Sequence, residues 1–321
     1  MERREFVLAL LATWAANGMG CGGQPETLPS VDLNTMDLSA STFHRIYDDV
    51  GLRDRFFKFL QNVFNLYPDH MFHQLIIDVT NAYGTDAQIY QQLLDRLPSI
   101  APVGGMVRYA LPALKKQKQV MTEQSVRCLE GLDTIDGYLE VGTTGRYLKP
   151  LSKHIPIVGT KTIVNDIKPT YGPADMVERG RVLKSGSFVD LANYRPFDSA
   201  IIPPASMQVV SNLIGFHHCP DEQLEAFIDS IRQTLKPKGR LLLREHNVVD
   251  ATMDAFVALA HDVFNAGVAV SWPDNQAQFR HFRSVLDWQT VLQRHGLNMR
   301  GAPQYQVHDP TDNAMLCFEA V

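Results

Sequence analysis

The spacing of apolar residues predicts helices in the first part of the chain. Apolar positions recur every three or four residues there, as they do along one face of an α-helix. An aromatic stripe of this kind is typical of a helix that packs into a core. We therefore expect residues 25–130 to form an all-helical region. The segments with this spacing are 53–67 (Phe56, Phe59, Leu60, Val63 and Phe64), 70–79, 86–97 and 111–129.

The pattern changes at Gly131, where short apolar runs begin to alternate with helical segments. Such alternation is typical of a parallel sheet whose strands are joined by helical crossovers. We predict an α/β fold over residues 131–321, with a doubly wound, mostly parallel, seven-stranded-type sheet and the all-helical region as an N-terminal extension. Ligands of such sheets bind at the carboxyl ends of the strands. The expected strands are 137–141, 162–167, 188–190, 207–212 and 240–245, and the expected helices are 145–154, 174–182 and 221–235.

Composition and charge narrow the classes of function. Of the 321 residues, 45% are hydrophobic and 20% are charged, which suits a globular protein with a large core. The net charge is −5, so we do not expect nucleic acid to be the main partner, because phosphate binding needs a basic surface. The four cysteines form no CxxC pair, which predicts neither a disulfide framework nor a zinc ribbon. Of these, Cys128, Cys219 and Cys317 are expected to be buried.

Residues 1–24 have the three parts of a bacterial export signal. Arg3 and Arg4 precede an apolar run over residues 6–16, and small residues stand before Cys21. The run is too short to span a bilayer but suits the core of a signal peptide. The arginine pair resembles the twin-arginine motif, and the residues before Cys21 resemble a lipoprotein cleavage box. These features predict a membrane-associated or periplasmic protein, anchored through a lipidated Cys21; an amphipathic helix with a chance arginine pair would instead leave the protein cytoplasmic.

The sharpest motif is a strand that carries Glu140 and then turns through Gly142 and Gly145. Glycine lets the backbone approach a ligand, and the N–H groups of a following helix can face the charged end of that ligand. An acidic residue on the strand suits a ligand with a cationic amine, whereas the pyrophosphate of a dinucleotide prefers its absence. The motif therefore predicts a ligand site at the end of the first strand.

Acidic residues follow at the ends of the next two expected strands. Asp166 closes the second strand, where a carboxylate can accept both ribose hydroxyls of a nucleoside, and Asp190 closes the third. The segment 209–220 then leads into a helix, and 235–243 predicts a helix stop, a turn and a fifth strand. In order and spacing these motifs resemble the class I methyltransferases that depend on S-adenosylmethionine (SAM). The resemblance is firm over residues 136–247.

The resemblance implies an enzyme that transfers the methyl group of SAM, with a small molecule rather than a protein as the expected acceptor. Two features depart from the family pattern: Thr144 and Arg146 stand where glycine is frequent, and the stretch from Gly145 to Asp166 is long. The resemblance assigns the methionine part of SAM to Glu140, Gly142, Thr143 and Gly145, the ribose to Asp166, the adenine to Asp190 and Leu191, and the sulfonium side to Ser211, Asn212 and Leu213.

Ionisable side chains gather after the fourth and fifth expected strands. Methyl transfer is an in-line displacement, so the protein mainly positions the acceptor and can remove its proton, a role that suits histidine near neutral pH. A structural role stays open, in which the histidines bond to backbone and Arg244 pairs with Glu245. We expect no metal, because adjacent residues such as His217, His218 and Cys219 rarely point at one ion. The catalytic candidates are His217, His218, Glu245 and His246, with Arg244 and His281 nearby.

Two other classes of function stay open. A non-catalytic lipoprotein that senses or stores SAM or another nucleoside would keep the same fold, and only turnover separates it from an enzyme. An NAD(P)-dependent oxidoreductase fits less well, because Glu140 and the reduced glycine motif oppose a pyrophosphate. The sequence leaves the acceptor atom open.

Overall fold

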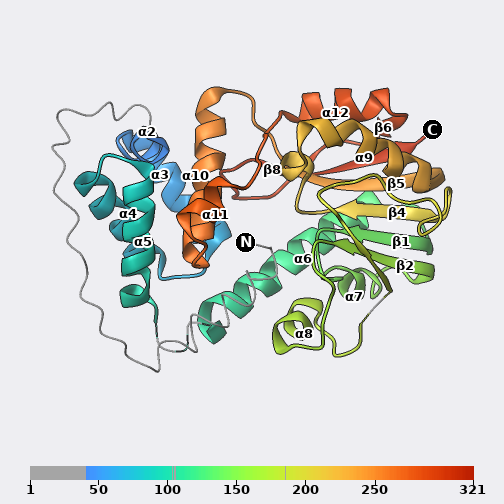
Figure 1. Ribbon diagram of the computed structural model, residues 1–321, viewed down its shortest axis with the longest axis horizontal. Helices are drawn as coiled ribbons and strands as arrows, with labels where there is room; N and C mark the ends of the chain where they lie inside the picture. The colour runs from blue at the N-terminus through green and yellow to red at the C-terminus, as the bar shows by residue number, and fades with distance from the viewer. Residues whose placement is uncertain (1–40, 103, 105, 185) are drawn as a thin grey trace.

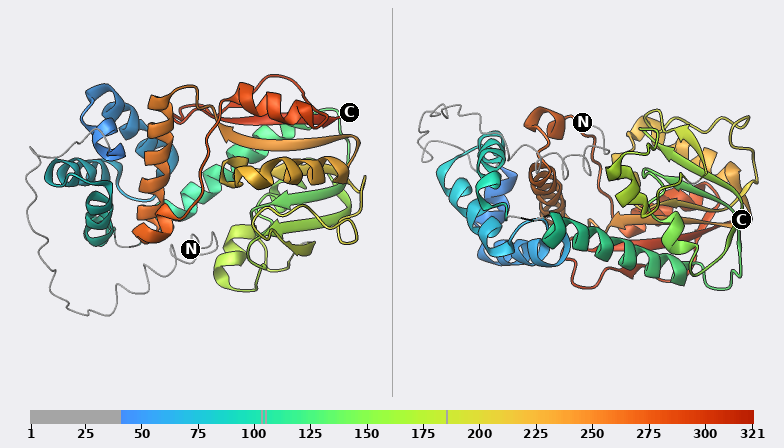
Figure 2. Two further views of the ribbon diagram at one scale, coloured as in Figure 1. Left: turned by 45° about the horizontal axis from the view of Figure 1, so that its top comes forward. Right: turned by 90° about the horizontal axis from the view of Figure 1, so that it is seen from below.

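The computed structural model describes residues 41–321 apart from 103, 105 and 185, and within them the chain forms a helical part and an α/β part (Figure 1). The long helix α6 (Leu111–Cys128) runs from the helical part to the sheet, as the further views also show (Figure 2). The expected export signal and Cys21 lie outside the described residues. In the described range, no helix is both long enough and apolar enough to cross a bilayer.

The helices expected before residue 130 are present, and short polar residues begin several of them. Ser41, Asp49 and Thr85 each accept a hydrogen bond from a backbone N–H of the helix that follows. The predicted aromatic stripe is confirmed as core, since Phe56 and Phe64 are almost fully buried. The helices are α2 (Thr42–Tyr47), α3 (Val50–Phe59), η3 (Leu60–Phe64), α4 (Asp69–Ala82), α5 (Asp86–Ile100) and η4 (Met106–Ala110).

A segment from the C-terminal half completes the helical part. The helices α10 (Ala251–Gly267) and α11 (Trp272–Gln276) follow the fifth strand but pack on the N-terminal helices, and α10 shares their core (Figure 1). The rings of Phe56 and Phe256 meet edge to face, with centroids 5.4 Å apart. Residues 251–276, which the sequence-based division assigns to the α/β part, therefore contribute to the helical core. Apolar spacing indicates a helix but not the core that the helix joins.

The strands form one sheet in the order β3-β2-β1-β4-β5-β8-β6, with β7 paired to β8. Neighbours from β3 to β5 are parallel, whereas β8 is antiparallel to β5, β6 and β7. This confirms the predicted doubly wound, mostly parallel sheet. The order reverses between β1 and β4, which makes their carboxyl ends the switch point where ligands bind. The strands are β1 (Ile135–Val141), β2 (Ile157–Asn165), β3 (Ser187–Asp190), β4 (Met207–Asn212), β5 (Leu235–His246), β6 (Leu297–Met299), β7 (Gln304–Tyr305) and β8 (Asn313–Ala320).

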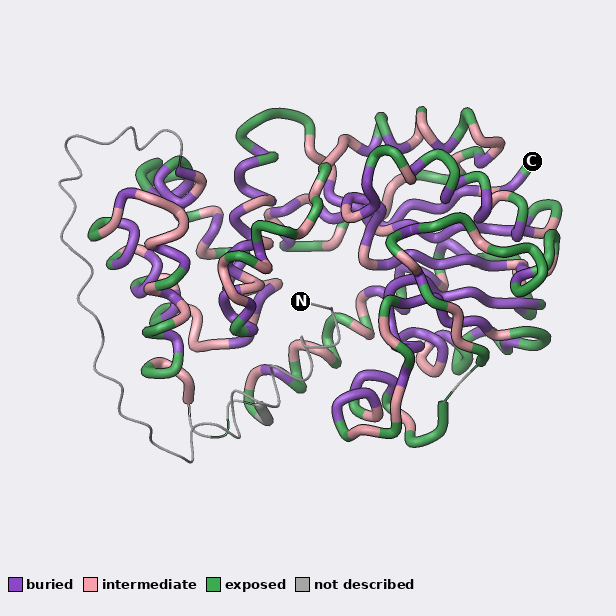
Figure 3. The backbone as a smooth tube through the Cα atoms, viewed as in Figure 1, coloured by how far each residue is buried: buried purple, intermediate pink, exposed green. Residues whose placement is uncertain are grey.

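Helices cover both faces of the sheet, so its strands are largely buried (Figure 3). Alternation along β1 sends Leu139 and Val141 to one core and Tyr138 to the other. The first core includes α9 (Asp221–Thr234) and α12 (Val285–Arg294), and the second includes α6 and the short α7 (Leu148–Leu151). The cysteines Cys128, Cys219 and Cys317 are free and buried, as predicted. The remaining helices are α8 (Pro173–Arg179) and η5 (Phe216–His218).

The predicted helix 145–154 is wrong in its extent, because only the four residues of α7 are helical. Ahead of α7, Thr143 Oγ1 accepts hydrogen bonds from the N–H groups of Gly145 and Arg146, at 3.2 Å each. Side-chain bonds of this kind satisfy the backbone in place of helical bonds. Pro150 lies within α7 and has no N–H to donate to a helical bond. The glycine turn is therefore not followed by the long helix N-terminus that the motif led us to expect.

Candidate functional site

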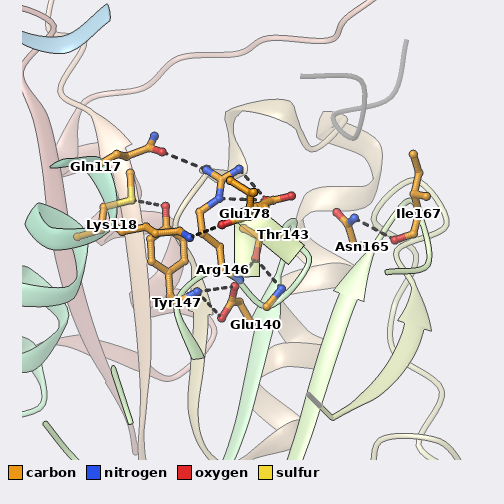
Figure 4. A network of polar contacts seen from close by, with 12 residues as sticks. Gln117, Lys118, Glu140, Thr143, Arg146, Tyr147, Asn165, Ile167 and Glu178 are labelled. Carbon is orange, nitrogen blue, oxygen red and sulfur yellow. Dashed lines mark hydrogen bonds and ion pairs between the residues drawn. The ribbon is translucent and has the colours of Figure 1, made fainter. Parts of the chain in front are cut away.

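The glycine turn at the end of β1 is built around the buried carboxylate of Glu140 (Figure 4). This carboxylate accepts hydrogen bonds from the Thr143 hydroxyl, from the Tyr138 hydroxyl at 3.2 Å, and from the Tyr147 N–H at 3.2 and 3.3 Å. Burial raises the pKa of Glu140, and the three donors oppose that rise. Both oxygens of Glu140 are thus bonded within the turn and its own strand.

Arg146, which stands at a position where glycine is frequent in the family that the sequence resembles, connects the turn to the neighbouring helices. Its guanidinium donates to one carboxylate oxygen of Glu178 at 2.7 and 3.0 Å and to Gln117 at 3.1 Å (Figure 4). Burial and the nearby Arg146 cation lower the pKa of Lys118 to about 8. The side chain of Arg146 therefore fastens the turn to α6 and α8 and has a structural role.

The end of β2 differs from expectation, whereas β3 ends at Asp190 as expected. The strand β2 ends at Asn165, which pairs in register with Asp190, and Asp166 follows just outside the sheet. The side chains of Asp166 and Asp190 are exposed, and Leu191 is buried. One oxygen of Asp190 accepts a hydrogen bond from the Ala192 N–H at 2.9 Å. The correction is that Asn165, and not Asp166, closes the second strand; both acids still lie at the carboxyl edge of the sheet.

At the end of β4 the three predicted residues are buried. Ser211 Oγ lies 2.8 Å from the Tyr138 hydroxyl, so Ser211 belongs to the hydrogen-bond network of Glu140. Asn212 Oδ1 accepts from the Gly215 N–H at 3.1 Å. The side chain of Leu213 lies in the core shared with α6 and α7.

Three buried polar atoms at these strand ends have no hydrogen-bond partner among the described residues. They are Thr144 Oγ1 after β1, Asn165 Oδ1 on β2 and Asn212 Nδ2 on β4. A buried polar group without a partner is costly, so such atoms are usually bonded to a ligand or to water. Two acceptors and a donor around the switch point fit a ligand with several polar groups, as a nucleoside or an amino acid has. A cavity of about 120 Å³ adjoins Thr144 and can hold part of such a ligand.

A histidine–carboxylate pair lies at the ends of β4 and β5. His217 Nδ1 is 2.7 Å from Glu245 Oε2, and both side chains are buried. The other oxygen of Glu245 accepts from the N–H groups of Phe216 and His217. Gly215 allows this arrangement, since it has φ of +91° and an added Cβ would lie 2.4 Å from the His217 ring. The carboxylate therefore fixes His217 as the tautomer that carries its proton on Nδ1.

Three more histidines surround His217. The centroid of its ring lies 4.3 Å from that of His218, 5.2 Å from that of His261 and 5.8 Å from that of His246. His246 is bonded at both nitrogens, to the Thr311 carbonyl at 3.0 Å and to Asn313 at 3.3 Å. Burial lowers the pKa of His246 and of His261 well below the usual range, so both rings are neutral. His217, His218, Glu245 and His246, the predicted catalytic candidates, are thus close together.

The side chains of Arg244 and His281, which the sequence places near these candidates, bind other partners. The guanidinium of Arg244 donates to Gln306 at 2.8 Å, and side chains alternate along β5, so Arg244 does not pair with Glu245. His281 binds Asp221 at 2.8 Å on the surface. Sequence reasoning missed His261, because it belongs to a helix whose apolar spacing gives no sign that it faces the sheet.

Comparison with known proteins gives structural matches only. No protein-family model matches the chain, and no curated protein matches it. Among solved structures, the N-methyltransferase NodS from Bradyrhizobium japonicum WM9 matches with a TM-score of 0.40 and 15% identity, over 63% of this chain and 96% of that one. Human N-acetylserotonin methyltransferase, solved with SAM, matches with a TM-score of 0.42 and 13% identity, over 89% of this chain and 72% of that one.

A third match is the 1,6-didemethyltoxoflavin-N1-methyltransferase of Burkholderia thailandensis, solved with 1,6-didemethyltoxoflavin and S-adenosylhomocysteine. Its TM-score is 0.44 and its identity 11%, over 74% of this chain and 91% of that one. All three are methyltransferases, the class that the sequence resembles. At these TM-scores the likeness by itself carries no conclusion about the chain, so its function has to follow from its own residues.

Proposed function

We propose that the chain is a SAM-dependent methyltransferase that acts on a small molecule. The observation that carries this proposal is the pairing of two features at the switch point of the sheet. Unsatisfied polar atoms of Thr144, Asn165 and Asn212 lie at the ends of β1, β2 and β4, and the buried His217–Glu245 pair lies at the ends of β4 and β5. The first feature suits a polar ligand and the second a proton transfer. Resemblance of residues 136–247 to class I methyltransferases supports SAM as that ligand.

In this proposal, residues at the ends of different strands bind different parts of SAM. Thr144 and the backbone at Gly142 and Gly145 take the methionine part, and both glycines have positive φ, of +80° and +90°. The exposed carboxylates of Asp166 and Asp190 accept hydrogen bonds from the ribose and the adenine. Asn212 faces the sulfonium side. Bound SAM supplies an electrophilic methyl group on a cationic sulfur.

The histidine–carboxylate pair prepares the acceptor. His217 takes the proton of an acceptor hydroxyl or amine at Nε2, while its Nδ1–H stays bonded to Glu245. The buried carboxylate stabilises the imidazolium that forms, as in other pairs of this kind. Deprotonation would make the acceptor atom a nucleophile for the methyl group that bound SAM supplies.

Two measurements test this proposal. Calorimetric titration of the full chain with SAM, S-adenosylhomocysteine and NADH should give micromolar binding of the first two and none of the third; preferential binding of NADH would refute it. Tritiated SAM and a small-molecule extract of the source cells should then give a labelled product. Binding of SAM without any labelled product would favour the non-catalytic sensor.

We also infer, from the sequence of residues 1–24 alone, that the protein is exported and held at the membrane through Cys21. The supporting features are the Arg3–Arg4 pair, the apolar run and the small residues before Cys21. Cell fractionation of the wild type and of an Arg3→Lys/Arg4→Lys variant tests this. Wild-type protein found wholly in the cytosol with Met1 attached would contradict both export and attachment through Cys21.

A further inference from the structure

Three histidines from the two parts of the molecule bring ring nitrogens together at their junction. His217 and His218 form part of η5 after β4, and His261 lies on α10 of the helical part. One ring nitrogen of each residue lies within 4.8 Å of the other two. In a tetrahedral zinc site, metal–nitrogen bonds of ~2.0–2.1 Å place the ligand nitrogens about 3.4 Å apart. Small rotations of these side chains would therefore let all three bind one ion.

The hydrogen bonds of the three rings prepare them for this role. Each Nδ1 faces an oxygen that can only accept: Glu245 Oε2 at 2.7 Å, the Phe279 carbonyl at 3.1 Å and the Val257 carbonyl at 2.9 Å, for His217, His218 and His261 respectively. Each Nδ1 is consequently the donor, which leaves Nε2 as the atom of each ring whose lone pair can bind a metal. That is the state in which histidine binds a metal.

Two further observations point to a ligand at this place. His217 Nε2 is buried and has no hydrogen-bond partner within the part of the chain that the structure describes, although Glu245 holds the ring from its other side. Glu245 accepts the Nδ1–H of His217 and is itself fixed by two backbone N–H groups. A carboxylate that orients a histidine in this way is the usual outer partner of a metal-bound imidazole.

We propose that His217, His218 and His261 bind one divalent transition-metal ion, with Zn²⁺ as the reference ion. Three imidazoles suit Zn²⁺, Cu²⁺, Fe²⁺ and Ni²⁺ and would leave a fourth position for water or another ligand. His246 is not a ligand, because both of its nitrogens are bonded within the protein. The ion would also join α10 to the sheet. The expectation of no metal considered only adjacent residues, and it lacked the third ligand from α10.

This inference goes beyond the proposed methyl transfer and does not depend on it. An ion on His217 Nε2 occupies the lone pair that the proposed base uses, so the metal-bound and the base forms of His217 exclude each other. Metal binding is measured without SAM or turnover. Failure of the metal site would leave methyl transfer standing, and a failure to bind SAM would leave the metal site standing.

The test is titration of the full chain, free of any polyhistidine tag and of bound metal, with Co²⁺ and then Zn²⁺. We expect one Co²⁺ per chain with the intense visible absorption of four-coordinate cobalt, and its loss as Zn²⁺ displaces Co²⁺. His261→Gln and His218→Gln should each weaken Zn²⁺ binding roughly 100-fold or more, and Glu245→Gln roughly 10- to 100-fold. His281→Gln is the matched control, since this histidine lies nearby but binds Asp221, and its affinity should not change.

Circular dichroism of each variant checks that it folds. Zn²⁺ binding that His261→Gln leaves unchanged in a folded protein would overturn the site, and so would the absence of binding by the wild type. If the variants do not fold, X-ray absorption of the Zn²⁺-loaded wild type decides. Three imidazole nitrogens at ~2.0 Å support the site, whereas a sulfur ligand or fewer than three imidazoles overturns it.

Discussion

The molecule holds two buried carboxylates at the carboxyl edge of one sheet, and they are used in opposite ways. Glu140 at the glycine turn is bonded to Thr143, Tyr138 and Tyr147, all from its own strand and turn. Glu245 at the end of β5 is bonded to η5, and it holds His217, whose other ring nitrogen has no hydrogen-bond partner in the described range. The first carboxylate stabilises its own turn, and the second orients the ring of His217.

The difference follows from where the partners come from. A carboxylate whose donors lie within seven residues is bonded at both oxygens by local structure and stabilises the turn. Glu245 instead binds a side chain that follows another strand. It orients the His217 ring through Nδ1 and leaves Nε2 to contact a ligand. Burial alone therefore does not distinguish a structural acid from one that serves a functional group.

The largest expected effect is on the rate of methyl transfer when the His217 imidazole is removed. His217→Gln is expected to lower the methyl-transfer rate by about 10²- to 10⁴-fold, because a general base contributes that much, while SAM affinity stays within about twofold. Steady-state rates with labelled SAM and calorimetry measure the two quantities. His281→Gln serves as the control that keeps full rate. A normal rate of methyl transfer by His217→Gln would show that Glu245 does not orient a general base.

The next effect concerns stability at the turn. Glu140→Ala leaves two buried donors, the Thr143 hydroxyl and the Tyr147 N–H, without this acceptor, so we expect the free energy of unfolding to fall by about 4 kcal/mol. Urea unfolding measures it. Glu130→Ala, at an exposed position, should change stability by less than about 0.5 kcal/mol. Equal stabilities of the two variants would show that the Glu140 network contributes little to the fold.

The histidine cluster should make stability depend on pH. Burial holds the pKa of His246 and His261 well below the usual range, whereas in the unfolded chain both take up protons below about pH 6.5. The unfolded state then binds more protons, so stability falls as pH drops through 6.5, by up to about 1.4 kcal/mol per pH unit for each histidine. Unfolding curves between pH 7.5 and 5.5, with a chelator present, measure the slope. His261→Gln should reduce it; a slope that this change does not alter would assign the effect to other groups.

The sequence predicts well what local spacing determines. The five expected strands are present, the expected turn after β1 has Gly142 and Gly145 at positive φ, and Glu140 lies on β1 as the motif predicts. These features depend on residues a few positions apart. The predicted histidines also meet, because the carboxyl ends of neighbouring parallel strands lie at one edge of the sheet.

Features that depend on tertiary contacts could not be predicted in this way. The helix expected over 145–154 is short because the hydroxyl of Thr143 takes up the backbone donors of the turn. His261 reaches the cluster only because α10 leaves the α/β part and packs on the N-terminal helices. The spacing of apolar residues along α10 does not indicate which helices it packs on. The end of β2 at Asn165 is set by its register with β3, so a one-residue shift separates it from the expected Asp166.

This one-residue shift gives the smallest and most specific prediction. The resemblance to class I methyltransferases assigns the ribose to Asp166, which follows β2 at an exposed position. The buried Asn165 has an oxygen without a hydrogen-bond partner among the described residues. If Asp166 accepts the ribose hydroxyls, Asp166→Asn should weaken SAM binding about tenfold, which corresponds to about 1.4 kcal/mol. Asp133→Asn, which changes an exposed acid ahead of β1, should leave the affinity unchanged. Calorimetry of both variants and of Asn165→Ala separates the two neighbours. If only Asn165→Ala weakens SAM binding, the ribose is bound by Asn165 and not by Asp166. The last residue of β2 would then bind the cofactor, as we propose for Asn212 at the end of β4.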